Sequence, residues 1–187
     1  GCFFTLYTTS GASDRIRPMS VKCVVTIRPQ MIKDAADFYR IIKDGNFPFF
    51  PTNIKSITAE KRFLRKSREQ WKNKKAFNFS VLLRGKVVGA VGLIPERDRP
   101  YNVEIGYFID REHHGKGFAL QAALQAELFA KVFWPELRRL QAIIVVDNAP
   151  SIRVIEKAGY KREGCLQSYL RCGDNYHDAY IYGKIIR

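Results

Sequence analysis

A strand followed by a glycine turn and a long helix is the feature that most constrains this chain. Residues 103–109 are apolar and typical of a strand, and a helical pattern begins near Phe118 and runs to about Trp134. Between them lie Gly115 and Gly117, which let the backbone approach a ligand closely. The first N–H groups of a helix have no intrahelical partners, so this junction favours a phosphate-bearing ligand. The alternative is that the glycines only permit a tight turn.

The remainder of the chain carries alternating strand and helix patterns. Strands are expected at residues 23–28, 101–109, 140–146, 160–163 and 176–186, with a hairpin over 77–83 and 87–94 whose turn is 84–86. Helices are expected at 34–43, at 58–75 with Thr58 as cap, and at 151–158. The aromatic loop at 47–51 packs either as a lid over the core or as a wall of a substrate pocket. Repeats and linkers are not evident, so the sequence predicts one mixed α/β domain.

The chain is strongly basic, with 32 Lys and Arg against 18 Asp and Glu among 187 residues and a formal net charge of +14. Many of the cations cluster in and just after the second predicted helix: Lys61, Arg62, Arg65, Lys66, Arg68, Lys72, Lys74 and Lys75. We interpret this cluster as the solvated face of a helix. The alternative is attraction to an acidic surface, such as ribosomal RNA or an acidic peptide, and such binding would weaken with salt. A recognisable nucleic-acid module does not accompany the charge.

The four cysteines, Cys2, Cys23, Cys165 and Cys172, are scattered along the chain. They lack the rhythm of a disulfide scaffold, which indicates a reducing compartment and predicts a cytoplasmic protein. The paired short spacing of zinc sites is also missing, so Cys165, Cys172 and His177 are not expected to bind a metal.

Several short motifs follow one another in a defined order. They are EIGYFI at 104–109, HGKGFA at 114–119, DNAPS at 147–151, EKAGY at 156–160 and EGCL at 163–166. In this order they resemble the GNAT acetyltransferase superfamily and, within it, the ribosomal-protein N-terminal acetyltransferases of the RimJ/RimL type. The resemblance covers roughly residues 22–187. It implies an α/β fold whose mixed central sheet of about six to seven strands is flanked by helices and splayed into a V for acetyl-CoA.

Residues 1–21 are left as an N-terminal extension of unknown role. They are either a tag remnant or an extension ahead of a natural start at Met19. A third reading is a lipidated anchor, because Gly1 and Cys2 would fit myristoylation and palmitoylation once an initiating Met was removed.

The resemblance implies acetyl-CoA as co-substrate, without a metal, and assigns most of its binding to backbone. The pyrophosphate would be held by His114, Gly115, Lys116, Gly117, Phe118 and Ala119, with Lys116 adding charge. A backbone N–H near Phe108 or Ile109 would polarise the acetyl oxygen. Asn148 would bind the pantetheine arm, or else cap a helix. Glu112 stands where the family usually has Gln or Arg, which costs little if the N–H groups bind the phosphates.

The same resemblance gives two candidate catalytic side chains. Glu104 would be the general base, since a carboxylate in an apolar cleft can have a raised pKa. The alternatives are that it only anchors the substrate ammonium or pairs with a surface arginine. Ser151 would hydrogen-bond the CoA sulfur, or else cap the helix that starts there. Two departures stand out: Ile155 replaces the Tyr that many members use as general acid, and Leu170 replaces a second carboxylate of some relatives.

Taken together, these residues predict an acetyl-CoA-dependent N-acetyltransferase acting by direct attack on a primary amine. The favoured acceptor is a protein N-terminal α-amine, with association with the ribosome. The alternatives are a small-molecule amine, such as a polyamine or an antibiotic-like amino sugar, and a non-catalytic basic RNA- or ribosome-associated protein. The sequence leaves the choice between monomer and dimer open.

Overall fold

The computed structural model describes residues 3–6, 19–22, 24–45, 47–49 and 56–186. Gly1 and Cys2 of the proposed lipid anchor, Cys23 of the first predicted strand and residues 50–51 of the aromatic loop lie outside these ranges. Within the N-terminal extension, β1 (Phe3–Leu6) pairs antiparallel with β2 (Met19–Lys22) in a two-stranded sheet of their own. The role of residues 1–21 stays a prediction.

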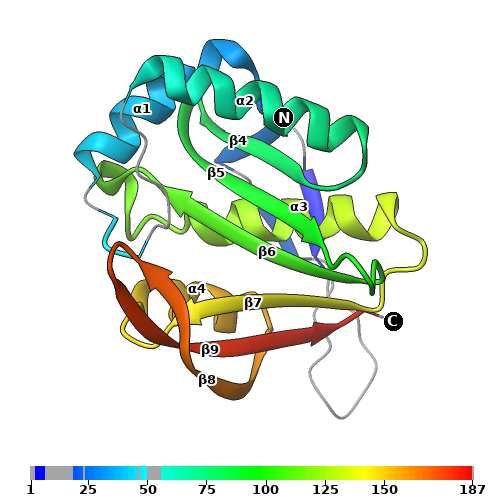
Figure 1. Ribbon diagram of the computed structural model, residues 1–187. Coiled ribbons are helices and arrows are strands. Elements are labelled where there is room, and N and C mark those ends of the chain that lie inside the picture. Colours follow the sequence, from blue (N-terminus) through cyan, green and yellow to red (C-terminus); the bar gives the residue numbers. More distant parts are fainter. Residues whose placement is uncertain (1–2, 7–18, 23, 46, 50–55, 187) are drawn as a thin grey trace.

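The main sheet has seven strands in the order β3-β4-β5-β6-β7-β9-β8 (Figure 1). Their bounds are β3 (Val25–Pro29), β4 (Phe77–Leu83), β5 (Lys86–Pro95), β6 (Asn102–Ile109), β7 (Arg139–Val145), β8 (Lys161–Cys172) and β9 (Asn175–Ile185). All neighbours are antiparallel except β6 and β7, which run parallel. The predicted mixed sheet is confirmed.

Helices cover both faces of the sheet (Figure 1). The helices α1 (Ala35–Asp44) and α2 (Ile57–Lys72) lie together over β4 and β5, and α3 (Phe118–Phe133) packs on the opposite face against β3, β5 and β6. The short α4 (Ala149–Lys157) contacts β7 and α3, and two 3-10 turns, η1 (Ile32–Asp34) and η2 (Arg111–His113), precede α1 and α3. Among the described residues, no helix combines the length and the apolar content needed to cross a bilayer.

The core is divided by the sheet into two clusters. On the α3 side, Ala122, Ala126 and Ala130 are fully buried, and their small side chains let the helix lie close to the strands. On the α1–α2 side, a smaller cluster forms around Phe38 and Leu64. Because strand side chains alternate between faces, β5 contributes Val91 and Leu93 to the first cluster and Ala90 to the second.

Three predicted boundaries were wrong. The helix α2 is capped by Ser56, whose Oγ accepts the Ala59 N–H at 3.1 Å, and not by Thr58. The helix α4 begins at Ala149 because Asn148 takes the cap position expected of Ser151. The strand β8 runs to Cys172 instead of ending at residue 163. Its edge position exposes most of its side chains and two irregularities break its register, so it lacks the alternating pattern of a half-buried strand.

The cluster of basic residues lies on the exposed surface of α2 and the turn after it. All eight of its side chains are exposed, as the interpretation of a solvated helix face predicted. The buried side of α2 is instead formed by Glu60, Leu64 and Ser67. A carboxylate in that set was not expected from the sequence.

Candidate functional site

The central feature of the site is a splay between β6 and β7. The two strands pair only from Asn102 with Arg139 to Glu104 with Gln141, although β6 continues to Ile109 and β7 to Val145. In the described part of the chain, their facing backbone edges beyond this point have no strand partner. The V-shaped opening expected of an acetyl-CoA site is therefore present.

The glycine turn lies at the wide end of this splay. Gly115 and Gly117 have φ values of +73° and +75°, in the left-handed region that favours glycine. Gly117 is the N-cap of α3 and has no side chain over the helix end. The His114 ring nitrogen Nε2 lies 2.7 Å from the Ile109 carbonyl oxygen, and the Lys116 ammonium donates to the Glu112 carbonyl at 2.9 Å. Both side chains thus brace the turn.

A cavity of about 600 Å³ opens over this turn, and we call it the glycine-turn cavity. Its walls come from the turn, the start of α3, the aromatic loop and the exposed side of α4. Three cations, Arg111, Arg153 and Lys157, line it together with the first turn of α3, Phe118 to Leu120. None of these three was predicted, because Arg111 lies on η2, far in sequence from Arg153 and Lys157 on α4, and only the fold brings them to one cavity.

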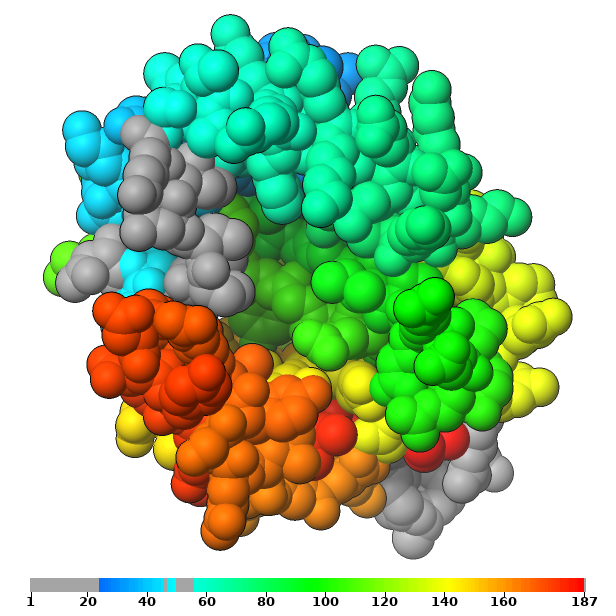
Figure 2. Space-filling view, viewed as in Figure 1, coloured from blue at the N-terminus to red at the C-terminus, as the bar shows by residue number. Residues whose placement is uncertain are grey.

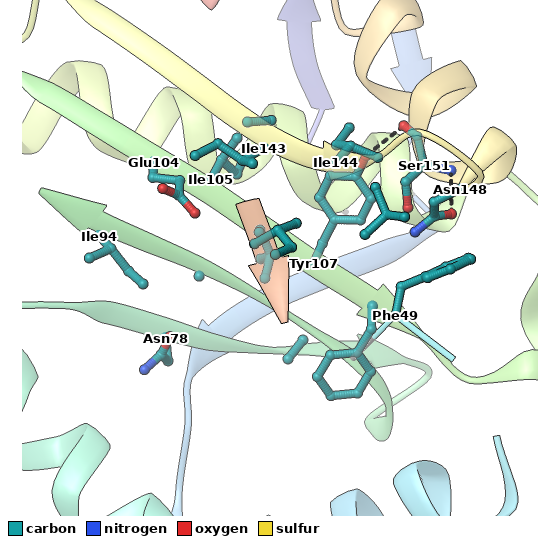
Figure 3. Close-up of a pocket in the computed structure, with 18 of the residues that line it drawn as sticks. Phe49, Asn78, Ile94, Glu104, Ile105, Tyr107, Ile143, Ile144, Asn148 and Ser151 are labelled. Carbon is teal, nitrogen blue, oxygen red and sulfur yellow. Dashed lines mark hydrogen bonds between the residues drawn. The ribbon is translucent and has the colours of Figure 1, made fainter. Parts of the chain in front are cut away.

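Asn148 and Ser151 stand where α4 begins, at the boundary of this cavity (Figure 3). The Asn148 Oδ1 accepts the Ser151 N–H at 3.3 Å, so Asn148 is a helix cap. The Ser151 carbonyl accepts the Tyr107 hydroxyl at 3.0 Å, a contact that bridges the splay from β6 to α4. Burial raises the pKa of Tyr107 well above its ordinary value, so its hydroxyl keeps its proton. No local pattern in the sequence predicts this bridge.

A second cavity of about 440 Å³ lies between the sheet and the helices α1 and α2, and we call it the α2 cavity. Figure 2 shows it as a hollow bounded by α2, by green strands at its base and by the orange β8. Tyr107, Phe108, Asn148 and Ser151 line both cavities. The two spaces therefore meet at the splay.

The floor of the α2 cavity contains two glycines that are opposite each other in the sheet. Asn78 pairs with Gly92, and Gly92 with Gly106, so these positions share one face. A Cβ at Gly106 would meet nothing within 4 Å. The missing side chain leaves open space above β6 on the face that Gly106 shares with Glu104 and Phe108.

Glu104 lines the α2 cavity and is only partly buried. Burial and the nearby Glu96 raise its pKa, so it holds a proton to higher pH than an ordinary glutamate. None of the ion pairs among the described residues includes Glu104, so it is not paired with a surface arginine. The carboxylate is thus available to a ligand.

Glu60 supplies a second carboxyl to the α2 cavity, from α2 itself. It is 2% exposed, its Oε2 has no hydrogen-bond partner, and burial raises its pKa to about 7. Leu170, where some relatives carry a carboxylate, also lines this cavity, whereas Ile155 is fully buried in the core. The sequence does not show that Glu60 is buried, because exposed cations surround it along α2.

The aromatic loop contributes to both cavities. Phe49 lines each of them and packs edge-on against His177 of β9, with ring centroids 5.9 Å apart. Phe47 packs against Phe108 at 5.7 Å. Within its described part the loop both lines the cavities and, through Phe47, packs against the smaller core cluster, so the two expected roles both stay open.

The N–H groups of β6 point alternately toward β5 and toward the splay. This alternation decides which of the two predicted N–H groups, that of Phe108 or that of Ile109, could reach an acetyl oxygen in the splay. The Asp110 N–H donates to Val88 of β5 at 2.8 Å, so the N–H of Phe108, two residues earlier, also faces β5. Alternation then turns the N–H of Ile109 toward the splay. Of the two predicted residues, Ile109 is the one whose N–H faces the opening.

The thiols and histidines of the described residues do not gather into a metal-binding group. Cys165 is exposed and Cys172 buried, and both are free thiols. Across the described ranges, no set of three or more His, Cys, Asp or Glu side chains is arranged to hold a metal ion.

With this geometry in place, the chain matches the model of the acetyltransferase (GNAT) domain over residues 25–161. The chain belongs to the GNAT acetyltransferase family. It is 34% identical over 110 residues to the ribosomal-protein-serine acetyltransferase of Escherichia coli (strain K12), which is 58% of this chain and 60% of that protein. The match thus spans less than two thirds of that relative's length.

Solved structures show the same fold. The chain resembles Mycobacterium smegmatis RimJ in complex with CoA-disulfide, with a TM-score of 0.77 and 24% identity over 86% of this chain and 81% of that one. It also resembles RimL, a ribosomal L7/L12 alpha-N-protein acetyltransferase in complex with coenzyme A, with a TM-score of 0.80 and 17% identity over 89% and 96% of the two chains. The predicted likeness to the RimJ/RimL branch is confirmed.

Proposed function

We propose that this protein transfers an acetyl group from acetyl-CoA to the α-amine at the N-terminus of a protein. The observation that carries the proposal is the meeting of the two cavities at the splay, where Tyr107, Phe108, Asn148 and Ser151 line both. A thioester entering from the glycine-turn cavity and an amine entering from the α2 cavity would meet there. Holding two reactants in one cleft can supply a large share of the rate acceleration.

The glycine-turn cavity fits the phosphate end of acetyl-CoA. The left-handed glycines bring the backbone of residues 114–119 to the cavity wall, and the first turn of α3 offers N–H groups and the positive end of a helix dipole. Arg111, Arg153 and Lys157 add positive charge. The Lys116 ammonium would have to leave the Glu112 carbonyl to do the same.

Glu104 is our candidate for the general base. Its raised pKa suits it to take a proton from an ammonium, directly or through a water molecule. The freed amine would then attack the thioester carbon, forming the C–N bond as the C–S bond breaks, and its remaining extra proton would pass to the departing sulfur or to solvent. The N–H of Ile109, which faces the splay, would stabilise the negative charge that develops on the acetyl oxygen.

Ser151 is our candidate for stabilising the departing thiolate, and its Oγ would donate a hydrogen bond to the sulfur. Tyr107 holds the Ser151 carbonyl from across the splay at 3.0 Å, so we assign it a positioning role. Asn148 caps α4 at the same point and lines both cavities, which supports a hydrogen bond from its side-chain amide to the pantetheine arm.

A protein N-terminus is favoured as acceptor by the character of the α2 cavity and its surroundings. The cavity is open and mostly apolar, with Glu104 and Glu60 as its only acidic residues in the described part of the chain. The E. coli relative is named for acting on a ribosomal-protein serine, and the RimL structure for a protein α-amine. The helix α2 forms one wall of this cavity, and the cations on its exposed face would attract an acceptor presented on an acidic surface, such as the ribosome.

Two measurements test this function in sequence. Isothermal titration calorimetry with acetyl-CoA should show binding, and no binding would overturn any acetyltransferase role. A thiol-release assay against N-terminal peptides and small amines should then show the highest kcat/KM with peptides. Turnover of a polyamine or amino sugar but of no peptide would contradict the proposed acceptor.

A further inference from the structure

Glu60 is a buried acidic group that the chemistry above does not use. It lies in the first turn of α2 and lines the α2 cavity, yet it is 2% exposed. It takes part in none of the ion pairs formed by the described residues. Its Oε2 is buried without a hydrogen-bond partner. Such a group destabilises the fold unless something satisfies it, so its presence calls for an explanation.

Two polar residues that line this cavity, Gln30 and Asn78, are hydrogen-bonded to a third residue, Ser67. Ser67, one of the other buried residues of α2, donates to the Gln30 side chain at 3.2 Å and accepts from the Asn78 amide at 3.1 Å. Gln30 and Asn78 line the cavity but are committed to this network. The carboxyl of Glu60 is therefore left for a group that enters the cavity from outside.

The position of Glu60 separates it from the proposed reaction centre. Glu104 comes from β6 in the floor, whereas Glu60 comes from α2 in the wall that also contains Phe63 and the α1 residues Phe38 and Ile42. An acceptor whose amine lies near Glu104 and the splay would direct an adjacent substituent toward α2. That substituent meets apolar side chains and one carboxyl.

We propose that Glu60 is a specificity-determining residue, which binds a hydrogen-bond donor on the side chain of the acceptor's first residue. The donor is either a hydroxyl or a second ammonium, since both satisfy an unpaired carboxyl oxygen. This inference rests on the proposed function. A site built to hydrogen-bond a substrate group rejects an analogue that lacks it, because its own buried polar atom is then left unpaired.

The test uses matched acceptor peptides that differ only in their first residue. Thr and Val have nearly the same shape but differ by the hydroxyl, and 2,3-diaminopropionate compared with Ala adds an ammonium. For the unaltered protein we expect kcat/KM to be roughly tenfold to a hundredfold higher for the peptide with the donor in at least one pair. The pair that shows the preference identifies hydroxyl or ammonium as the donor.

Two variants of Glu60 then show whether this residue causes the preference for a donor on the first residue of the peptide. In Glu60→Leu the ratio of kcat/KM between the two peptides of a pair should fall close to one. The KM for acetyl-CoA should stay unchanged. Glu60→Gln should retain a preference for a hydroxyl, because its amide oxygen still accepts, and lose a preference for an ammonium. The matched control is Glu69→Gln, an exposed position on the same helix, which should leave all ratios unchanged. Thermal unfolding and acetyl-CoA affinity verify that each variant is folded.

The possible results distinguish a failure of the role of Glu60 from a failure of the proposed function. Peptides that are acetylated without either preference, or with a preference that survives in folded Glu60→Leu, overturn the role of Glu60 and leave the proposed function standing. Failure of the unaltered protein to acetylate any peptide overturns the proposed function itself, and the inference with it.

Discussion

The glycine-turn cavity and the α2 cavity are built from the chain in different ways. The first is mainly a local structure, in which β6, a turn and the start of α3 follow one another between residues 102 and 120. The second gathers Asn78, Glu104, Glu60 and Leu170 from four separate elements. The backbone of the glycine turn can keep its shape while the distant side chains of the α2 cavity vary. One fold can therefore bind the same donor and different acceptors.

The largest loss of turnover is expected from a change at Glu104 in the α2 cavity. Replacing Glu104 with Gln should lower kcat with the best acceptor by roughly 10²- to 10⁴-fold, the usual contribution of a general base. Because its pKa is raised, kcat/KM of the unaltered enzyme should rise with pH as the carboxyl loses its proton, and that rise should vanish in the variant. Steady-state measurement of kcat/KM as a function of pH, for the unaltered enzyme and the variant, tests this. Unchanged kinetics would remove Glu104 as base.

Glu60 should influence stability as well as specificity. Its pKa is about 7 in the folded protein, against an ordinary value of 4.5, so the folded state holds the proton more tightly. Stability is then lost as pH rises from about 4.5 through 7, by roughly 3 kcal/mol in total. The free energy of unfolding of Glu60→Gln, measured with urea at pH 4.5 and 8.5, should not show this loss. A pH dependence equal to that of the unaltered protein and of Glu69→Gln would contradict a buried, unpaired Glu60.

Adding a single methyl group to the glycine turn should weaken the binding of acetyl-CoA. Gly117→Ala forces an unfavourable left-handed conformation on alanine and places a Cβ where the backbone meets the ligand. We expect acetyl-CoA to bind roughly tenfold to a hundredfold more weakly. Gly85→Ala is the matched control, since Gly85 has a φ of +82° in the β4–β5 turn and an equally open surrounding. Equal losses of affinity in both variants would show that strain alone is responsible.

A smaller effect is expected where the two cavities meet. Tyr107→Phe removes the hydroxyl that donates to the Ser151 carbonyl but keeps the ring in the splay. Loss of one hydrogen bond that positions Ser151 should lower kcat by roughly threefold to tenfold, with little change in the KM for either substrate. A rise in the acceptor KM with unchanged kcat would instead indicate that Tyr107 contacts the acceptor.

The same contrast explains what the sequence predicted and what it did not. The strand–turn–helix around Gly115 and Gly117 was predictable because strand alternation, left-handed glycine and helix periodicity are all local. Glu60 was not, because it lies among exposed cations and only the packing of α2 on the sheet buries it. The Tyr107 bridge to Ser151 joins residues 44 positions apart and carries no local signal. The roles of Glu104, Ser151 and Asn148 remain predictions.

Isothermal titration of acetyl-CoA into Gly106→Val and Gly117→Ala, beside the unaltered protein, tests most directly whether the two cavities are separate sites for donor and acceptor. A valine at Gly106 would fill open space in the α2 cavity. We expect Gly106→Val to bind acetyl-CoA as tightly as the unaltered protein while losing acceptor turnover, and only Gly117→Ala to bind acetyl-CoA more weakly. Loss of acetyl-CoA affinity in Gly106→Val, with none in Gly117→Ala, would contradict it.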